Sequence, residues 1–130
     1  DEIVLVEQYR VPLGRRCLEL PAGLVGDTDA GEDVADAAVR ELEEETGYRA
    51  GAIDIIGEFN SSPGMVSEGF TLVRAGNLSK VGDGGGDEHE QITVHLVPLA
   101  EVKFFVDAKR AEGVAMDVKL LLLLGDQLLR

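Results

Sequence analysis

The sequence predicts an α/β fold in which helices pack against a β-sheet. Three observations lead to this prediction: strand-like and helix-like segments alternate, no internal repeat is visible, and 45 % of the 130 residues are hydrophobic. Interleaved strands and helices are typical of a sheet covered by helices. A chain of this length and apolar content supplies one hydrophobic core. We therefore expect a single domain over residues 1–130 with an α/β sandwich architecture.

Two strands are expected at the start of the chain. Residues 3–10 (IVLVEQYR) are rich in β-branched and apolar types, which favours a buried strand, and turn residues at 12–14 end it. A second strand is predicted at 17–20. Because strand-like residues begin almost at once and the chain opens without Met, we expect an N-terminal part of the protein to precede residue 1.

A polar loop and an acidic helix are expected next. The small and polar residues of 26–31 predict the loop. Residues 32–46 contain no Pro or Gly, are rich in Ala, and carry acidic residues in the first turn, where the helix dipole stabilises negative charge. Gly47 is expected to end the helix, since glycine readily adopts the left-handed conformation found there.

Three further strands and two helices are expected in the rest of the chain. Their predicted ranges are 52–59, 70–75 and 92–97 for the strands, and 99–111 and 114–128 for the helices. Turn residues separate the first two of these strands. Residues 81–90 are rich in Gly and acidic residues, which predicts a long loop that either has no role or carries function.

The charge of the chain limits its partners. A formal net charge of −13 argues against binding nucleic acid through a basic face, because phosphate contacts need clustered Lys and Arg. A polyanionic substrate is therefore expected to be bound through metal. No segment approaches the roughly 20 apolar residues that span a bilayer, so no membrane partner is expected. Cys17, the single cysteine, fits a reducing compartment, and we expect a cytoplasmic protein.

Three acidic residues of the predicted helix share one face. Glu41 precedes Glu44 by three residues and Glu45 by four, and residues at these spacings are neighbours on a helix surface. Like charges at this spacing repel, and a divalent cation removes the repulsion. Mg²⁺ prefers oxygen ligands and commonly bridges carboxylates to substrate phosphates. A merely acidic, solvated helix is the alternative that the run of glutamates alone leaves open.

Residues 26–48 resemble the Nudix box. Gly26, Glu32 and the run 40–48 (RELEEETGY) match every specified position of that signature. The resemblance implies a Nudix-type α/β/α sandwich around a mixed β-sheet. It also implies a site for two or more Mg²⁺ or Mn²⁺ ions, with these metal-side carboxylates: Glu41, Glu44 and Glu45.

Outside the box, four segments resemble the ADP-ribose pyrophosphatase branch of this family. In chain order they are 7–10 (EQYR), 18–23 (LELPAG), 62–68 (SPGMVSE) and 88–92 (EHEQI). The resemblance implies that Arg10 contacts the substrate and that the Ala22 carbonyl is a metal ligand. It further implies a wall facing the terminal ribose that is shaped by Pro63, Gly64 and Met65.

The last of these segments resembles the loop that supplies a catalytic base and another metal ligand. Glu88 is the expected base and Glu90 the expected ligand. Exchanged roles, His89 as the base, and two merely solvated loop acids are the alternatives that stay open.

The chain departs from the branch pattern at one position. Branch members use the glycine of the Pro-Ala-Gly segment as the first box glycine. Here Gly23 lies three residues before Gly26, which is the glycine that fits the box spacing. We interpret this difference as a small loop insertion that leaves the helix register unchanged.

The resemblance implies hydrolysis of the diphosphate of ADP-ribose, giving AMP and ribose 5-phosphate. Metal ions would activate water and stabilise charge with the help of Glu44 and Glu45, and Glu88 would accept a proton. The alternatives are hydrolysis of ADP-sugars or dinucleotides, and a non-catalytic nucleotide-sugar sensor module. The intact carboxylate set counts against the sensor. Because the branch usually forms homodimers, a homodimer is expected.

Overall fold

The computed structural model of the chain describes residues 1–23, 32–86 and 91–130. Contacts divide the chain into two compact units. The first unit comprises Asp1–Pro21, Glu44–Thr46 and Asp83–Arg130, and the second comprises Ala22–Glu43 and Gly47–Gly82. Each unit has β-structure of its own.

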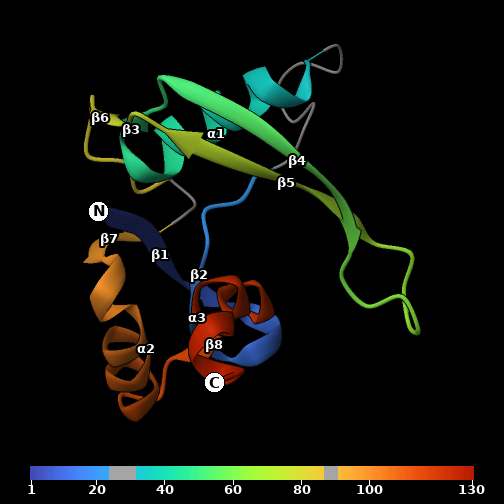
Figure 1. The fold of residues 1–130 in the computed structure, drawn as a ribbon, viewed down its shortest axis with the longest axis vertical. Helices are drawn as coiled ribbons and strands as arrows, with labels where there is room; N and C mark the ends of the chain where they lie inside the picture. The colour runs from blue at the N-terminus through green and yellow to red at the C-terminus, as the bar shows by residue number, and fades with distance from the viewer. Residues whose placement is uncertain (24–31, 87–90) are drawn as a thin grey trace. The chain divides into compact units, whose positions relative to one another are not determined.

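A four-stranded mixed sheet forms the centre of the first unit, with strand order β7-β1-β2-β8 (Figure 1). Its strands are β1 (Glu2–Arg10), β2 (Arg15–Glu19), β7 (Thr93–Pro98) and β8 (Ala115–Met116). β1 is antiparallel to both β2 and β7, whereas β2 and β8 are parallel. A 3₁₀ turn, η1 (Val11–Leu13), joins β1 to β2 and ends at Gly14, whose φ is 65°. The predicted α/β class with a mixed sheet is confirmed.

Two helices cover one face of this sheet. They are α2 (Val102–Ala111), which follows the 3₁₀ turn η2 (Leu99–Glu101), and α3 (Leu121–Leu128), which follows η3 (Val118–Leu120). Leu5 of β1 and Leu18 of β2 are 0 % exposed and share one hydrophobic core with residues of both helices. Since successive side chains of a strand point to opposite faces, Glu7 and Arg16 share this helix-covered face.

The opposite face of the same sheet, called the second face below, carries the alternate residues. From β1 and β2 these include Val4, Val6, Gln8, Arg10, Cys17 and Glu19. Val6 is 0 % exposed and Cys17 is 4 % exposed. The second face is therefore buried at its centre and places Arg10 and Glu19 near its end.

The structure corrects the helix predicted at 114–128. Residues Ala115 and Met116 instead form β8, which pairs with Cys17 and Leu18 of β2. The Asp117 side chain accepts a hydrogen bond from the Lys119 backbone N–H (3.0 Å). This cap starts a new helical turn after β8, so α3 begins only at Leu121.

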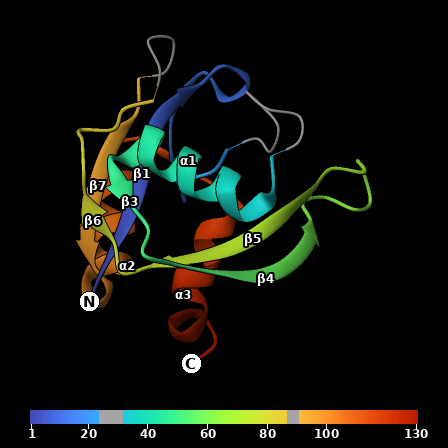
Figure 2. The ribbon, with the colours of Figure 1, turned by 90° about the horizontal axis from the view of Figure 1, so that it is seen from above.

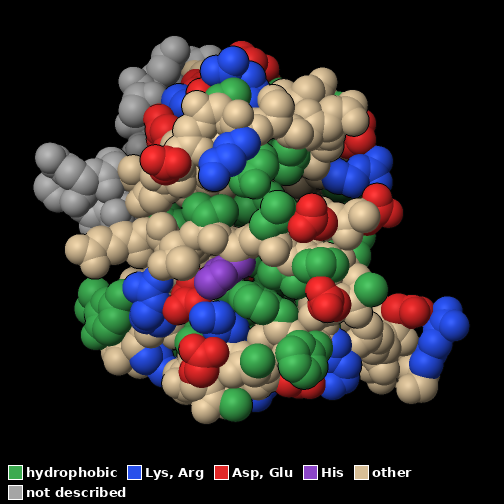
Figure 3. Space-filling model, turned by 90° about the vertical axis from the view of Figure 1, so that its left-hand side faces the viewer, with side chains coloured by type: hydrophobic (Ala, Val, Ile, Leu, Met, Phe, Trp, Pro, Cys, Tyr) green, Lys and Arg blue, Asp and Glu red, His purple; other side chains and the backbone are tan. Residues whose placement is uncertain are grey.

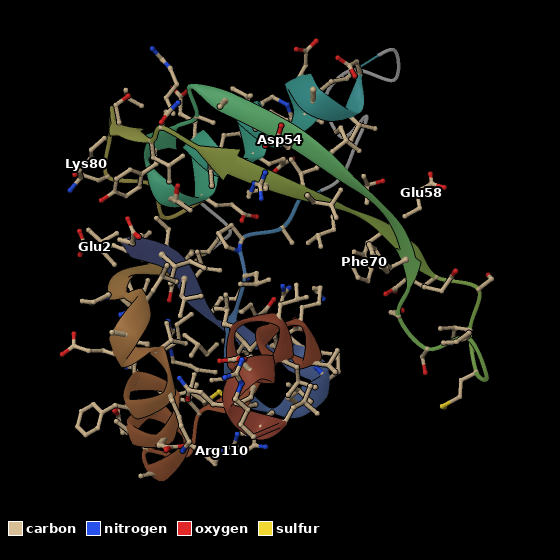
Figure 4. All side chains as sticks on the ribbon, viewed as in Figure 1. Glu2, Asp54, Glu58, Phe70, Lys80 and Arg110 are labelled. Atoms are coloured by element: carbon tan, nitrogen blue, oxygen red, sulfur yellow. The ribbon has the colours of Figure 1, made fainter. Side chains whose placement is uncertain are left out.

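The second unit holds the first part of α1 and two antiparallel ribbons. β3 (Tyr48–Arg49) pairs with β6 (Ser79–Lys80), and β4 (Ala52–Asn60) pairs with β5 (Gly69–Gly76). The β4–β5 hairpin is long, as Figures 1 and 2 show from two directions. Figure 4 labels Asp54, Glu58 and Phe70 along it, and the Phe59 and Phe70 rings stack with centroids 5.9 Å apart.

The helix α1 (Val34–Thr46) begins and ends as its sequence predicts, to within two residues. The Asp33 side chain accepts a hydrogen bond from the Ala35 backbone N–H (3.2 Å), so the helix starts after this cap and not at Glu32. Gly47 ends it with a φ of 78°, and its N–H donates to the Glu43 carbonyl. Glycine is favoured here because other residues are strained at this φ.

The described helices and one drawn face of the surface can be examined for membrane-spanning length and for charge. Over 1–23, 32–86 and 91–130, no helix has the length and apolar character needed to cross a bilayer. On the face drawn in Figure 3, Lys and Arg side chains are interleaved with Asp and Glu.

Candidate functional site

The helix α1 carries the three candidate metal-binding carboxylates. Glu44 is exposed, the Glu41 side chain is 15 % exposed, and Glu45 is 5 % exposed. Their spacing along one continuous helix puts all three on one face. The face therefore carries both a solvent-accessible carboxylate and a buried one. This combination suits a cation that is held by the helix and also contacts a substrate.

Arg40 of α1 forms hydrogen bonds to Glu32, which precedes the helix, and to Glu41 of the candidate site. Its guanidinium donates to both carboxylate oxygens of Glu32 (Nε–Oε2 2.8 Å, Nη2–Oε1 2.7 Å). Its Nη1 also donates to Oε1 of Glu41 at 3.0 Å. The hydrogen bond to Glu32 raises the pKa of Arg40, which stays charged. One oxygen of Glu41 is thereby held in place by the residue directly before it in the helix.

Gly23 lies directly against the Glu41 side chain. A Cβ atom added at Gly23 would overlap Cβ, Cγ and Cδ of Glu41. Only glycine allows this approach, so the Ala22–Gly23 backbone packs on a candidate metal ligand. Gly26, which fits the box spacing, lies outside the described residues, as do Glu88, His89 and Glu90. The close approach to Glu41 is made by Gly23, and the loop insertion stays a prediction.

These donors fit a hard divalent cation. Carboxylate oxygens of Glu41, Glu44 and Glu45, together with the Ala22 carbonyl, are the oxygen ligands that Mg²⁺ prefers. Among the side chains that the structure describes, no three or more His, Cys, Asp or Glu are grouped closely enough to hold a metal. A cation shared by the carboxylates of this helix face stays a prediction.

Substitution of Gly23 tests this contact. We expect Gly23→Ala to weaken Mg²⁺ binding by about 10- to 100-fold, as is typical when a ligand's supporting shell is disturbed, because the new methyl group displaces Glu41. Calorimetric titration of the purified protein with Mg²⁺ measures the change. Gly76→Ala is the matched control, since nothing lies within 4 Å of a Cβ at Gly76. Equal metal affinity for both variants would mean that the contact between Gly23 and Glu41 does not support metal binding.

Arg10, the candidate substrate-binding residue, is paired with a buried carboxylate. Its Nε and Nη2 atoms donate to Oε2 and Oε1 of Glu19, each at 2.7 Å. The Arg10 side chain is 45 % exposed and that of Glu19 is 10 % exposed. The hydrogen bonds to Glu19 raise the pKa of Arg10, and the negative charge of Glu45 adds to this effect. The guanidinium therefore lies within the electrostatic field of Glu45.

The remaining candidate substrate residues lie at the turn of the β4–β5 hairpin. Met65 is 86 % exposed, and its N–H donates to the Ser62 carbonyl at 2.9 Å. A Cβ at Gly64 would have nothing within 4 Å. Pro63, Gly64 and Met65 belong to the second compact unit, and Arg10 belongs to the first. Their part in a substrate wall stays a prediction.

A glycine run connects the end of α1 to the segment before β7, a feature that sequence reasoning missed. Gly84, Gly85 and Gly86 have φ values of 69°, 98° and 79°. The Gly85 N–H donates to the Glu45 carbonyl (2.8 Å) and the Gly86 N–H to the Glu44 carbonyl (3.0 Å). Only the density of glycines at 82–86 signalled such a turn. These two hydrogen bonds hold the glycine run against the end of α1.

Two other reactive side chains have structural partners. The Cys17 thiol has its pKa raised to about 11, first by burial and then by the nearby carboxylates of Glu19 and Asp117, so it stays protonated at neutral pH. His95 Nε2 lies 3.0 Å from Oε1 of Glu7, and its ring meets Phe105 edge-on. Neither residue is placed as a nucleophile.

Known proteins resemble this chain in sequence and in fold. The family model described as NUDIX domain matches residues 1–117. The methanol dehydrogenase activator of Bacillus methanolicus is 40 % identical over 111 residues, which cover 85 % of this chain and 58 % of that protein. The ADP-ribose pyrophosphatase of Bacillus subtilis is 37 % identical over 109 residues, which cover 83 % and 57 %.

A solved structure is also similar to this chain in fold and in sequence. The crystal structure of an ADP compounds hydrolase superposes with a TM-score of 0.68 and 30 % sequence identity, covering 82 % of this chain and 56 % of that one. The chain therefore spans a little more than half the length of these relatives.

Proposed function

Because this chain belongs to the Nudix family, we propose that it uses divalent metal to hydrolyse the diphosphate of ADP-ribose or of a closely related nucleoside diphosphate derivative. The carboxylate face of α1, with Gly23 packed against Glu41, is the observation that carries this proposal. The similarity to an ADP-ribose pyrophosphatase supports the substrate class.

The proposed metal ligands come from three parts of the chain: Glu41, Glu44 and Glu45 of α1, the carbonyl of Ala22, and Glu90. Bound Mg²⁺ or Mn²⁺ supplies positive charge to the phosphoryl oxygens and lowers the pKa of water. Two or more ions are proposed, since diphosphate cleavage places charge on both the attacked and the leaving group.

The chain's own residues would then position the substrate and move a proton. Arg10 offers its Nη1 to a phosphate or ribose oxygen, because Nε and Nη2 are already used by Glu19. Glu88 accepts the proton of the attacking water, and Glu90 is the alternative for that step. Attack on one phosphorus of ADP-ribose yields AMP and ribose 5-phosphate. Pro63, Gly64 and Met65 would face the terminal ribose.

The proposal also specifies the metal ion, the oligomeric state and the cellular compartment. Mg²⁺ is proposed as the working ion, with Mn²⁺ able to replace it. A homodimer is proposed, and analytical ultracentrifugation of the purified protein measures it. The cytoplasm is proposed as the compartment because the single cysteine is a buried thiol with no disulfide partner.

A substrate panel tests the proposed function. Purified protein is given ADP-ribose, ADP-sugars, NADH, diadenosine polyphosphates and nucleoside triphosphates with Mg²⁺, and kcat/KM is determined for each. We expect the highest kcat/KM for ADP-ribose. A higher value for an ADP-sugar or a dinucleotide would favour the neighbouring enzyme class, and tight binding without turnover would favour a sensor module.

A further inference from the structure

We infer that the outer edge of β7 binds an extended, basic segment of a partner protein, which adds a strand to the sheet and places side chains in a hollow beside α2. β7 is the last strand on one side of the β7-β1-β2-β8 sheet, as Figure 1 shows. This surface contains none of the proposed metal-binding or substrate residues, so binding there is a further function.

The hydrogen bonds of β7 show which of its backbone groups face away from β1. The Leu99 N–H donates to the Asp1 carbonyl (3.0 Å), in register with the antiparallel β1–β7 ladder. Hydrogen-bonded pairs alternate along such a ladder, so the odd-numbered residues of 93–97 bond to β1. The N–H and C=O groups of Val94 and Leu96 therefore point outward, away from the sheet.

The residues at the two ends of β7 agree with this direction. Ile92 is in phase with Val94, and its N–H donates to the Gly85 carbonyl (3.3 Å), outside the sheet. Pro98 is also in phase, and proline is tolerated in a sheet where its nitrogen faces an open edge. Among the residues that the structure describes, no other segment forms a hydrogen bond with the backbone of Val94 or Leu96. Two outward positions can therefore pair with a further strand.

β7 lacks the charged residues that commonly protect a sheet edge. Charged side chains, above all Lys, prevent an exposed edge strand from pairing with another chain. Residues 93–98 (TVHLVP) contain no Asp, Glu, Lys or Arg, although 28 % of the chain is charged. Leu96 is 47 % exposed. An added strand would pair with the open backbone and also cover this apolar side chain.

A hollow of about 360 Å³ lies beside this edge. It is lined by Val94–Pro98 of β7, by Glu101 at the end of η2, and by Phe104 and Phe105 of α2. Phe104 is 78 % exposed. Because successive side chains of a strand alternate between faces, every second side chain of an added strand points toward the helix-covered face and this hollow. The hollow offers such side chains two aromatic rings and one carboxylate.

Charge identifies the kind of segment that fits. Glu101 gives the hollow a negative charge, and the whole chain has a formal net charge of −13. A Lys or Arg side chain can lie on an aromatic ring while its charge meets the carboxylate. A second copy of this chain would bring another net charge of −13 and a second Glu101 to the same edge, so repulsion opposes it. A basic segment of another protein is therefore the better occupant.

Fluorescence anisotropy with two labelled peptides tests the inference. The probe is a capped hexapeptide of alternating Val and Arg. Its matched control carries Pro in place of each Val, which keeps the charge but removes every second N–H. We expect the probe to bind the wild type at least about 10-fold more tightly than the control peptide does, because backbone hydrogen bonds contribute about 1 kcal/mol each. Equal binding would mean that charge alone attracts both peptides, and it would overturn the inference.

Substitutions in the protein locate the binding to the edge of β7. Leu96→Pro removes an outward N–H and leaves the hydrogen bonds to β1 in place, so we expect it to fold and to bind the probe about 5- to 10-fold more weakly. Leu96→Ala is the matched control, since it shortens the side chain but keeps the N–H, and we expect a smaller loss. Unchanged binding in Leu96→Pro would overturn the inference. If Leu96→Pro does not fold, Glu101→Lys decides the question, with an expected loss of about 5-fold.

Sedimentation without peptide tests the competing occupant. We expect the oligomeric state of Leu96→Pro to equal that of the wild type over the same range of protein concentrations. A wild-type dimer that dissociates in Leu96→Pro but not in Leu96→Ala would show that a second copy occupies the edge, and it would overturn the inference.

Discussion

Replacing Glu45 with Gln is expected to lower kcat/KM for ADP-ribose by on the order of 10³-fold, since charge stabilisation by metal contributes several kcal/mol and each 1.4 kcal/mol is tenfold in rate. Glu45 is 5 % exposed and lies on the carboxylate face of α1. The amide keeps the shape of the side chain but removes the charge that the cation requires. Steady-state kinetics over a range of Mg²⁺ concentrations measure the effect.

Glu43→Gln is the matched control for this prediction. Glu43 belongs to the same helix, but its carboxylate accepts hydrogen bonds from Arg49 (3.0 and 3.1 Å), and these lower its pKa. Removing an exposed ion pair changes stability by less than about 1 kcal/mol, so activity should stay near the wild-type value. Equal losses in the two variants would mean that overall helix charge, and not the carboxylate face, supports activity.

Replacing Glu7 with Gln is expected to reduce the free energy of unfolding of the protein by about 3–5 kcal/mol, the range for removing one partner of a buried ion pair. Glu7 is 6 % exposed on the helix-covered face. Its carboxylate meets Arg16 Nε at 2.8 Å, His95 Nε2 at 3.0 Å and Lys109 Nζ at 3.0 Å. Glu7→Gln removes the negative charge that these three basic groups share as a partner. Urea unfolding at pH 7 measures the difference.

The same residue predicts how stability depends on pH. Burial of Glu7 opposes its ionisation, but hydrogen bonds from Arg16, Lys109 and His95 outweigh burial and lower its pKa from 4.5 to about 2. A lowered pKa stabilises the fold above the unfolded-state value, and this contribution is lost as the pH falls from about 4.5 to about 2. The contribution at neutral pH is about 3 kcal/mol, and Glu7→Gln should remove this part of the acid dependence.

Glu112→Gln is the control for the Glu7 substitution. Glu112 also faces Lys109, at 3.7 Å, but its side chain is 60 % exposed. Exposed pairs contribute about 0–1 kcal/mol, so this variant should unfold close to the wild type at every pH. A Glu7→Gln protein as stable as Glu112→Gln would show that the buried network does not stabilise the fold.

Local patterns explain why much of the fold was predictable from sequence. The strand at 3–10 and the helix end at Gly47 depend on neighbouring residues alone, and both are confirmed. The start of the segment 114–128 was predicted wrongly because its apolar residues suit a helix and a buried strand equally, whereas Leu121–Leu128 do form a helix. Its first residues became β8 through parallel pairing with β2, a contact between distant parts of the chain.

The candidate site, like the fold, was predictable from sequence only in part. The shared face of Glu41, Glu44 and Glu45 follows from helical spacing, so sequence alone places them together. The roles of these residues came from the family resemblance. The approach of Gly23 to Glu41 and the pairing of Arg10 with Glu19 depend on how separate elements pack, which no local pattern encodes.

Metal-dependent hydrolysis is decided by the release of AMP and ribose 5-phosphate from ADP-ribose by one protein sample, first with Mg²⁺, then with excess EDTA, and then with Mg²⁺ restored. We expect cleavage that stops on chelation, returns with the metal, and is nearly absent from the Glu45→Gln protein. No cleavage with Mg²⁺, or cleavage that persists in EDTA and in Glu45→Gln, would contradict it.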